Sequence, residues 1–295
     1  MNKGDDMEHA QGSYYVPHGS HWPILGSVGM GVLVVGIGMS LNGYTPVGNW
    51  ILALGAAIMI YMVFGWFATV IKESVSGLYN EQVDRSFRWG MGWFILSEVM
   101  FFAAFFGALF YARVLSVPWL GGEGTGLSTN MFLWPEFVAD WPTAGPAALG
   151  GAFETIGAWG VPALNTAILL LSGVTITWAH WGLKKDDRKH LVWGLLATVV
   201  LGVIFLGFQM YEYGHAYQDL NLTLASGIYG STFFMLTGFH GMHVTLGVIM
   251  LTVILLRSIK GHFSSHEHFG FEAVAWYWHF VDVVWLVLFV FVYWL

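Results

Sequence analysis

The sequence has 295 residues, of which none is cysteine and few are charged. The absence of cysteine excludes disulfide bonds, thiolate metal sites and cysteine nucleophiles, and it carries no information on the redox compartment. Charged residues make up 10% of the chain and hydrophobic residues 56%, whereas soluble domains contain roughly 25% charged residues. This composition indicates a polytopic membrane protein.

Basic sequence runs are also scarce, and the formal net charge is −7. This balance does not favour binding to nucleic acid, which requires concentrated positive charge. The N-terminus reads MNKGDDMEHAQGSYY. A cleavable signal peptide has a basic segment followed by an apolar one, and this acidic, polar start has neither. We therefore expect no signal peptide.

Seven apolar stretches are long enough to cross a bilayer, which takes about 20 helical residues at roughly 1.5 Å each. They are Trp22–Leu41, Asn49–Ile71, Trp89–Ala112, Gly160–Trp181, Leu191–Tyr213, Tyr229–Arg257 and Ala273–Leu295. We predict an all-α membrane protein with seven transmembrane helices. No extramembrane segment is long enough for a second domain, so residues 1–295 form one membrane domain, with a tail at 1–21. Small residues four apart, such as Ser27 and Gly31, favour close helix contacts.

The cations are distributed unevenly between the two sides of the predicted membrane. Ten of the 11 Lys and Arg fall on one side, namely Lys3, Lys72, Arg85, Arg88, Lys184, Lys185, Arg188, Lys189, Arg257 and Lys260. Arg113 is the exception. Because cations concentrate in cytoplasmic loops, the N-terminus is expected to be cytoplasmic (or in the matrix) and the C-terminus outside. The long segment Arg113–Trp159 then lies outside, as an ordered cap or docking face.

Several ionisable residues lie inside the predicted spans, at a cost of at least a few kcal/mol each near the bilayer centre. Helix rise places Glu98, His240, His243 and Asp282 at similar depths. Glu98 is interpreted either as a protonated hydrogen-bonding group or as part of a proton-linked or lipid-linked site. For His240 with Asp282, or for His279 with Asp282, we predict a hydrogen bond that holds helices together.

Metal ligation and proteolysis are weaker interpretations. His240 and His243 are three residues apart and imidazole binds iron, copper and zinc, but a haem between helices requires facing histidines at matched depth. His180, His190 and His215 fall at helix ends. Ser226 has no GxSxG turn around it. We therefore predict no metal ligand and no catalytic residue in this chain.

The links on the cation-rich side suggest a lipid site. Lys72 and Glu73 follow the second span, with Trp66 and Phe67 one turn inside, while Arg257 and His262 follow the sixth. Interfacial cations beside aromatic residues bind anionic lipid headgroups. The alternative is that these cations only set the topology.

Five long runs of the chain are distinctive: RWGMGWFILSEVMFFAAFF (88–106), LNTAILLLSGVTITWAHWGLKKDDRKH (164–190), QMYEYGHAY (209–217), GIYGSTFFMLTGFHGMHV (227–244) and HEHFGFEAVAWYWHFVDVVWLVLFVFVYWL (266–295). These runs resemble the cytochrome c oxidase subunit III family of the haem–copper oxidases. The resemblance covers about residues 66–295 and extends to SHWPILGSVG near the start.

The resemblance implies a two-helix unit at 22–71 splayed from a five-helix bundle at 89–295, with phospholipids in the cleft. It implies that haems and copper belong to partner subunits I and II, and that cytochrome c binds to the complex rather than to this chain alone. This subunit would bind no cofactor other than structural phospholipids, and would support proton uptake and stability of subunit I. The family's membrane glutamate matches Glu98, and its lipid-contacting positions match Trp66, Phe67, Lys72, Glu73, Arg257 and His262.

Two segments differ from the family pattern. The chain has His180-Trp181 where a His pair is common, and GLYNEQVDR where a His-rich piece follows the second helix. The long outside loop is similar to bacterial forms, so we expect a bacterial inner membrane, with mitochondria second. The alternative functions are an independent transporter or proton channel lined by Glu98, His240, His243 and Asp282, and a haem-binding membrane anchor.

Overall fold

The computed structural model describes residues 19–148 and 150–295, and within these ranges it contains helices and no strands. Seven of the described helices are long and apolar enough to cross a membrane, which confirms the predicted fold class. The predicted tail lies almost entirely outside the described residues. The chain divides into a first unit that ends at Phe87 and a second unit, Arg88–Leu295.

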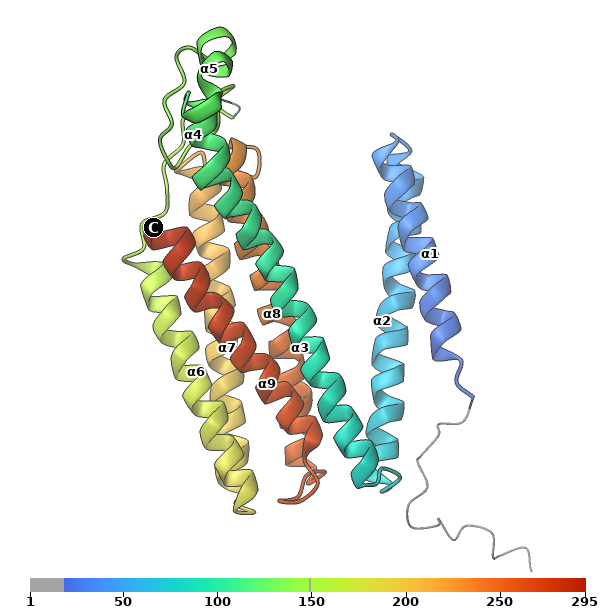
Figure 1. The fold of residues 1–295 in the computed structure, drawn as a ribbon. Helices are drawn as coiled ribbons and strands as arrows, with labels where there is room; N and C mark the ends of the chain where they lie inside the picture. Colours follow the sequence, from blue (N-terminus) through green and yellow to red (C-terminus); the bar gives the residue numbers. More distant parts are fainter. Residues whose placement is uncertain (1–18, 149) are drawn as a thin grey trace, which may run out of the picture. The chain divides into compact units, whose positions relative to one another are not determined.

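The first unit contains helices α1 (Trp22–Leu41) and α2 (Thr45–Val75), which run antiparallel along each other (Figure 1). Each has a proline in its first turn, where the missing N–H breaks no helical hydrogen bond. The bounds of α1 equal the predicted ones, whereas α2 extends the predicted span at both ends.

Glycines bring the backbones of α1 and α2 into contact. A Cβ added at Gly36 would lie 2.4 Å from the backbone nitrogen of Leu52, and one at Gly55 would lie 2.5 Å from that of Leu33. Around Gly31, nothing lies within 4 Å of the added atom. The prediction that Ser27 and Gly31 mark the helix contact is therefore wrong, because the contact follows a different face of α1.

The second unit is a bundle of five long helices. Helix α3 (Glu81–Phe110) starts at the end of the first unit and continues through a π-helical turn, η1 (Tyr111–Ser116), into α4 (Val117–Leu120). The others are α6 (Val161–Lys184), α7 (Arg188–Gln218), α8 (Gly227–Ile259) and α9 (Phe269–Leu288), which ends in the π-helical turn η3 (Phe289–Trp294).

The long segment Arg113–Trp159, which we expect to lie outside, is partly helical. Helical structure continues from α3 to Leu120, so the first eight residues of the expected loop Arg113–Trp159 belong to the span. A 3₁₀ turn, η2 (Gly124–Gly126), and the short helix α5 (Leu127–Leu133) follow. Extended and turn structure then leads to α6.

Helix α9 belongs to the most buried of the described spans, and it packs on α6 and α8. Its Trp278 is fully buried and donates from Nε1 to the Ser172 hydroxyl of α6 at 2.9 Å. A Cβ added at Gly202 of α7 or Gly247 of α8 would lie 2.9 or 2.7 Å from the Trp278 ring. The two glycines thus leave the space that the indole fills. The hydrogen bond to Ser172 satisfies the indole N–H, as a buried donor requires.

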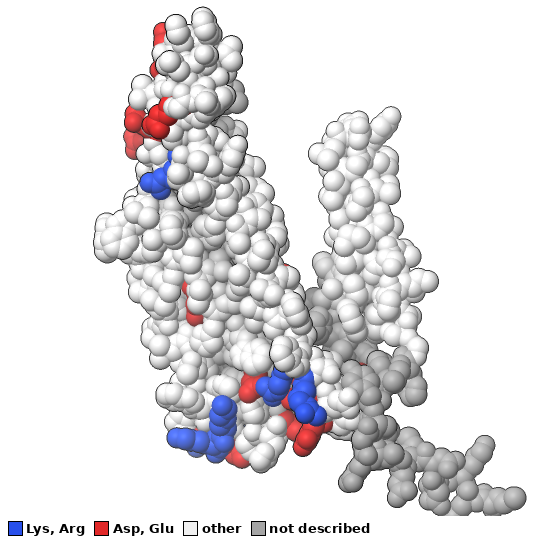
Figure 2. All heavy atoms as spheres, viewed as in Figure 1, with Lys and Arg blue, Asp and Glu red and all other residues white. Residues whose placement is uncertain are grey.

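Asp187, in the link between α6 and α7, caps the N-terminus of α7. The Asp187 carboxylate accepts hydrogen bonds from the backbone N–H groups of Lys189 and His190 at 3.1 and 3.2 Å. The bonds from the backbone and then the ring of His190 hold the pKa of Asp187 below its ordinary value. On the face shown in Figure 2, Lys and Arg of the second unit gather at the bundle end that carries this link.

Candidate functional sites among the polar groups of the bundle

Glu98 of α3 is paired with His243 of α8. Oε2 of Glu98 lies 2.7 Å from Nε2 of His243, and the two side chains are 21% and 6% exposed. The rings of Phe101 and Phe102 pack beside the imidazole at centroid distances of 5.9 and 5.0 Å. Glu98 is therefore half of an interhelical pair.

The hydrogen bonds of His243 fix how many protons the pair holds. Its Nδ1 lies 2.6 Å from the Phe239 carbonyl oxygen, which can only accept, so Nδ1 carries a proton and donates. One more proton must lie between Nε2 and Glu98, because an imidazole lone pair and a carboxylate oxygen repel each other. With that proton on either partner the pair is neutral overall, which makes it tolerable inside a membrane.

The other predicted packing residues match the expected pairs only in part. Nε2 of His240 donates to the Val281 carbonyl at 3.2 Å, so this histidine does hold α8 to α9, but not through Asp282. Oδ2 of Asp282 lies 3.7 Å from Nδ1 of His279, which is an ion-pair distance and too long for a hydrogen bond. The structure therefore brings Glu98 and His243 together, and joins His240 to backbone.

A second carboxylate in the bundle escaped the sequence analysis. Glu212 of α7 is buried and accepts a hydrogen bond from the Tyr293 hydroxyl at 2.5 Å. Gln209, one turn before it, is buried with both amide atoms lacking a partner among the described residues. Glu212 was overlooked because it falls at the end of the predicted span Leu191–Tyr213, whereas α7 continues to Gln218.

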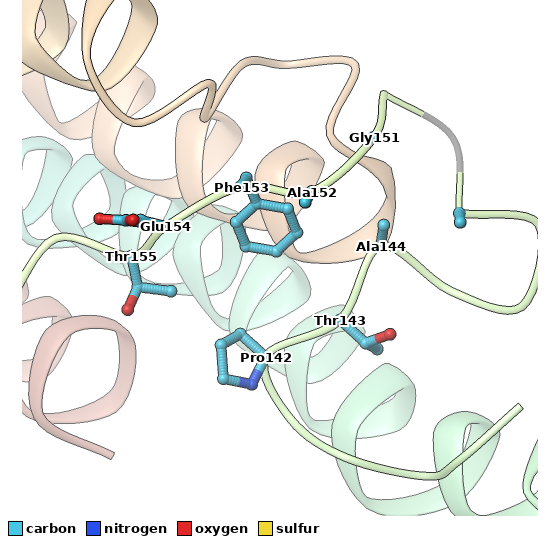
Figure 3. A pocket seen from close by; sticks show the side chains of 9 residues that line it. Pro142, Thr143, Ala144, Gly151, Ala152, Phe153, Glu154 and Thr155 are labelled. Atoms are coloured by element: carbon cyan, nitrogen blue, oxygen red, sulfur yellow. The ribbon is translucent and has the colours of Figure 1, made fainter.

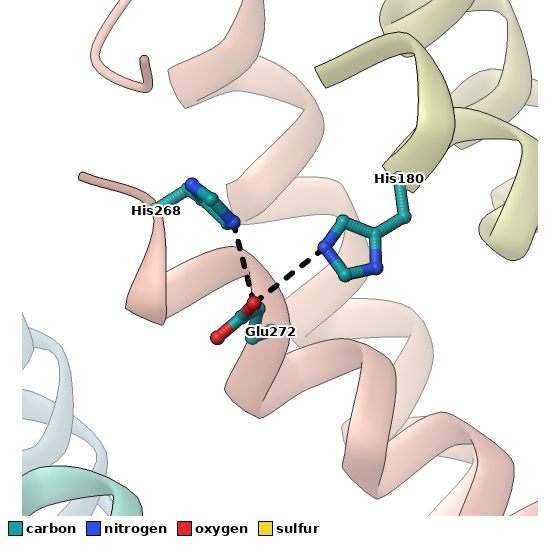
Figure 4. Close-up of side chains that lie close together, drawn as sticks. All are labelled: His180, His268 and Glu272. Atoms are coloured by element: carbon teal, nitrogen blue, oxygen red, sulfur yellow. Dashed lines mark ion pairs between the residues drawn. The ribbon is translucent and has the colours of Figure 1, made fainter. Parts of the chain in front are cut away.

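A third polar cluster lies at the cation-rich end of the bundle (Figure 4). Glu272 of α9 pairs through Oε2 with the guanidinium of Arg88 on α3. Its other oxygen, Oε1, lies 3.6 Å from Nε2 of His180 on α6 and 3.3 Å from Nε2 of His268. Figure 4 shows both rings directed at this oxygen. The predicted span began at Ala273, so Glu272 was not considered.

The residues expected to bind lipid are divided between the two units. Trp66 and Phe67 on α2 are exposed, and their ring centroids lie 6.4 Å apart. Lys72 and Glu73 belong to the last turn of α2 rather than to a link, and Glu73 accepts a hydrogen bond from the Tyr79 hydroxyl at 2.7 Å.

Arg257 and His262 flank the end of α8 in the second unit. The Arg257 guanidinium lies 4.4 Å from the centroid of the Phe263 ring. Among the described residues, neither a hydrogen-bond acceptor nor a carboxylate contacts this half-buried cation. His262 donates its backbone N–H to the Arg257 carbonyl at 3.1 Å, and its buried Nδ1 has no partner in the described part of the chain.

The long segment between α5 and α6 forms an open hollow of about 730 Å³. Its lining residues come from two stretches of the same loop, namely Pro142, Thr143, Ala144, Ala148 and Gly151–Thr155 (Figure 3). Phe153 stacks on Tyr229 of α8 at a centroid distance of 5.5 Å, which fixes the loop on the bundle. Among the lining residues that the structure describes, Glu154 is the only ionisable one, so these residues do not form a catalytic group.

The sequence matches known proteins along nearly its whole length. The family model described as cytochrome c oxidase subunit III matches residues 12–295. The chain belongs to this family. Curated relatives named cytochrome c oxidase subunit 3 include those of Gadus morhua, 39% identical, and Sus scrofa, 40% identical, each over 98% of this chain and 99% of the relative. The relative from Marchantia polymorpha is 42% identical over 93% of each chain.

Membership of the family confirms the resemblance identified from the sequence. Glu98, His180, Glu212, His243 and Glu272 all lie inside the matched residues. The seven helices and the oxidase family together establish a multi-pass membrane protein.

Proposed function

We propose that this chain is a non-catalytic core subunit of a proton-pumping cytochrome c oxidase, the complex that passes electrons from cytochrome c to dioxygen. The observation that carries the proposal is the match to the subunit III family over residues 12–295, with relatives about 40% identical over 98% of the chain. In this assignment the haems and copper are held by partner subunits I and II, and this chain binds them only indirectly.

Affinity purification tests this assignment. The full chain, tagged and extracted in mild detergent from membranes that produce it naturally, should bring down two haem–copper subunits in equal amounts. The chain produced alone should show no haem band in its redox spectrum. A stoichiometric haem band in the isolated chain would instead support the membrane-anchor alternative, and recovery of the chain without oxidase subunits would contradict the proposal.

A transporter or proton channel is the alternative from a different class. It requires a continuous polar path, whereas the described contacts join Glu98 to His243 and join His240 to the backbone of α9. Liposomes that contain only this chain should show no proton conductance above that of empty liposomes. Conductance that disappears in the Glu98→Gln variant would favour the channel.

Phospholipid binding is a finer part of the proposal. Arg257 is a half-buried cation stacked on Phe263, and no acceptor among the described residues neutralises it. A phosphate group of a lipid supplies the missing anion at the membrane interface. We expect Arg257→Ala to reduce the phospholipid retained after purification, and Lys260→Ala, an exposed cation in the same link, to leave it unchanged. Equal lipid content in both variants, measured by mass spectrometry, would rule out this role.

The exposed pair Trp66 and Phe67, with Lys72 and Glu73 on the next turns, is proposed to contact lipid in the same way from the first unit. Substituting both aromatics by Leu tests that contribution separately. The double variant should retain less lipid than the wild type while α1 and α2 still pair.

Support for proton uptake and for the stability of subunit I completes the proposal. Removing this chain from the purified complex should slow proton uptake from the inner side and shorten the active lifetime of the oxidase. Re-adding the wild-type chain should restore both. Unchanged uptake and lifetime in the depleted complex would contradict this role.

We propose a bacterial inner membrane with the N-terminus in the cytoplasm and the C-terminus in the periplasm. The cations at the α6–α7 and α8–α9 links support this orientation. Because the chain has no cysteine, single cysteines report the side directly. An impermeant maleimide applied to intact spheroplasts should label Val138→Cys and not Lys185→Cys, and the opposite pattern would invert the orientation.

A further inference from the structure

Three side chains, one from α6 and two from the start of α9, converge on a single point at the cation-rich end of the bundle. His180 comes from the last two turns of α6, His268 caps the start of α9, and Glu272 lies in the first turn of α9. One ligand-type atom from each lies within 4.8 Å of the other two. The side chains are 22%, 8% and 12% exposed, so the point is shielded but reachable from one side.

The distances between the histidine nitrogens and the Glu272 oxygen are longer than those of a hydrogen bond. In the Glu98–His243 pair the nitrogen and oxygen are 2.7 Å apart, which a hydrogen bond explains. At Glu272 the corresponding distances are 3.3 and 3.6 Å, and Nε2 of both His180 and His268 is buried without a hydrogen-bond partner among the described residues. Atoms bound to one tetrahedral zinc at about 2.0–2.1 Å are about 3.3–3.4 Å from each other.

The tautomer of His268 suits a cation. Its Nδ1 lies 3.0 Å from the Ser264 carbonyl oxygen, which can only accept, so Nδ1 carries the proton. In neutral imidazole the lone pair then lies on Nε2, directed at Glu272. Metal-bound histidines typically donate their second ring N–H to a carbonyl in this manner, which fixes the ring and raises its basicity.

The surroundings of the Glu272 carboxylate also suit a metal ligand. Arg88 pairs with Oε2 and leaves Oε1 facing the two histidines. A carboxylate paired with an arginine through one oxygen, with the imidazole lone pair of His268 directed at the other, is repulsive unless a proton or a cation lies between them. Arg88 thus plays the part of an outer-shell partner that orients a ligand.

We propose that His180, His268 and Glu272 form a binding site for a divalent transition-metal ion, with Zn²⁺ the best fit. Two imidazole nitrogens and one carboxylate oxygen match the ligand preference of zinc, and three protein ligands leave a fourth position for water. Binding displaces any proton held on the two Nε2 atoms. The ion joins the end of α6 to the start of α9, so it fastens these two helices at this end of the bundle.

His240 and His243, the two histidines three residues apart on α8, are not part of this site. Both His240 and His243 use a ring nitrogen on a backbone carbonyl, and the other nitrogen of His243 is taken by Glu98. The expectation that the chain binds no metal rested on these two histidines and on the position of His180, His190 and His215 at helix ends. The proposed site uses residues at helix ends that lie 88 and 4 positions apart in the sequence and meet only through the fold.

Zinc titration of the full chain tests the proposal. The chain, purified in mild detergent and stripped with a chelator, is titrated with Zn²⁺ alone, and bound zinc is counted by mass spectrometry and calorimetry. We expect one zinc ion per wild-type chain and an increase of its melting temperature. X-ray absorption of the loaded chain should show a nitrogen and oxygen shell near 2.0 Å with scattering from imidazole rings.

Two substitutions and one control complete the test. His180→Gln removes a nitrogen that makes no hydrogen bond with the described residues, so the fold should persist. His180→Gln and His268→Gln should each weaken zinc binding by more than the roughly 10–100-fold that loss of an outer-shell partner costs. His266→Gln, an exposed histidine two residues from His268, should bind zinc like the wild type.

Tetrahedral Co²⁺ absorption provides a second readout that does not depend on stability. It should appear in the wild type and in His266→Gln and be lost in His180→Gln. A folded wild-type chain that binds no stoichiometric zinc would overturn the proposal, and so would equal zinc binding by wild type and His180→Gln.

Discussion

The helices within each of the two units of this membrane protein are held together by different means. In the first unit, glycines allow the backbones of α1 and α2 to touch, and most large side chains of the pair point outward. In the second unit, buried indoles and hydrogen-bonded polar groups fill the space around α9. In lipid there is little hydrophobic drive between helices. Close backbone contact and satisfied polar groups are the two ways to replace it, and each unit relies mainly on one.

The largest effect is expected at the buried indole of Trp278. Trp278→Ala removes a fully buried indole and its bond to Ser172, and should destabilise the second unit by about 3–5 kcal/mol. Unfolding of the purified chain by a denaturing detergent, followed by tryptophan fluorescence, measures it. Trp276→Ala, at a position that is 37% exposed, is the matched control. Equal losses of unfolding free energy in the two variants would show that the buried indole of Trp278 is not what stabilises this unit.

In the first unit, the sensitive positions should be glycines. Gly36→Leu places a side chain against the backbone of Leu52 and should weaken pairing by about 1–3 kcal/mol, the usual cost of overpacking. Gly38→Leu, where the added atom meets open space, should have little effect. Cysteines at Ser40 and Asn49, whose side chains are hydrogen-bonded at 2.9 Å, report pairing through disulfide formation. Efficient cross-linking in Gly36→Leu would contradict backbone contact as the basis of this pair.

The polar pair of the bundle should give an intermediate effect. His243→Leu leaves Glu98 without its partner and should cost about 1–3 kcal/mol, as for other unsatisfied buried groups. Glu98→Gln keeps a hydrogen bond to the imidazole, so it should leave assembly intact and abolish labelling of this residue by a carbodiimide. Thermal stability and labelling are measured on both variants. Loss of all oxidase complex in Glu98→Gln would make the carboxylate itself indispensable to the structure.

The smallest effect is expected at the α6–α7 link. Because the pKa of Asp187 is lowered in the fold, its contribution is complete above its ordinary pKa and is lost as the pH falls through the lowered value. Amide exchange at Lys189 and His190, relative to their intrinsic rates, should therefore accelerate in acid. Asp187→Asn still caps the helix but does not titrate. An acid-dependent acceleration that persists in Asp187→Asn would assign the effect to another group.

Much of the architecture was predictable because membrane spans carry a strong signal. The bounds of α1 were predicted to the residue, and the count of seven was right. Spans end where side chains become polar in the sequence, whereas the helices continue one or two turns further. Helix α9 starts at Phe269, four residues before the predicted Ala273. That difference placed Glu272 outside the membrane helix and hid its i,i+4 relation to His268.

Partners between helices were less predictable because depth fixes only one coordinate. Equal depth correctly placed Glu98 and His243 at one level, but helix rotation decides which groups face each other, and His240 turned to the backbone of Val281. The glycine contacts did have a signal in the sequence. Gly29 and Gly36 on α1, and Gly48 and Gly55 on α2, recur at seven-residue spacing, which keeps one face of each helix toward the other.

The single proton shared by Glu98 and His243 has an electrical consequence. A membrane potential of 100 mV acts on one elementary charge with about 2.3 kcal/mol across the full bilayer. On a neutral pair it acts only through a shift of the proton between atoms 2.7 Å apart, about a tenth of a core roughly 30 Å thick. The pair is therefore nearly insensitive to voltage while its proton stays, and becomes a charge in the field only when that proton leaves.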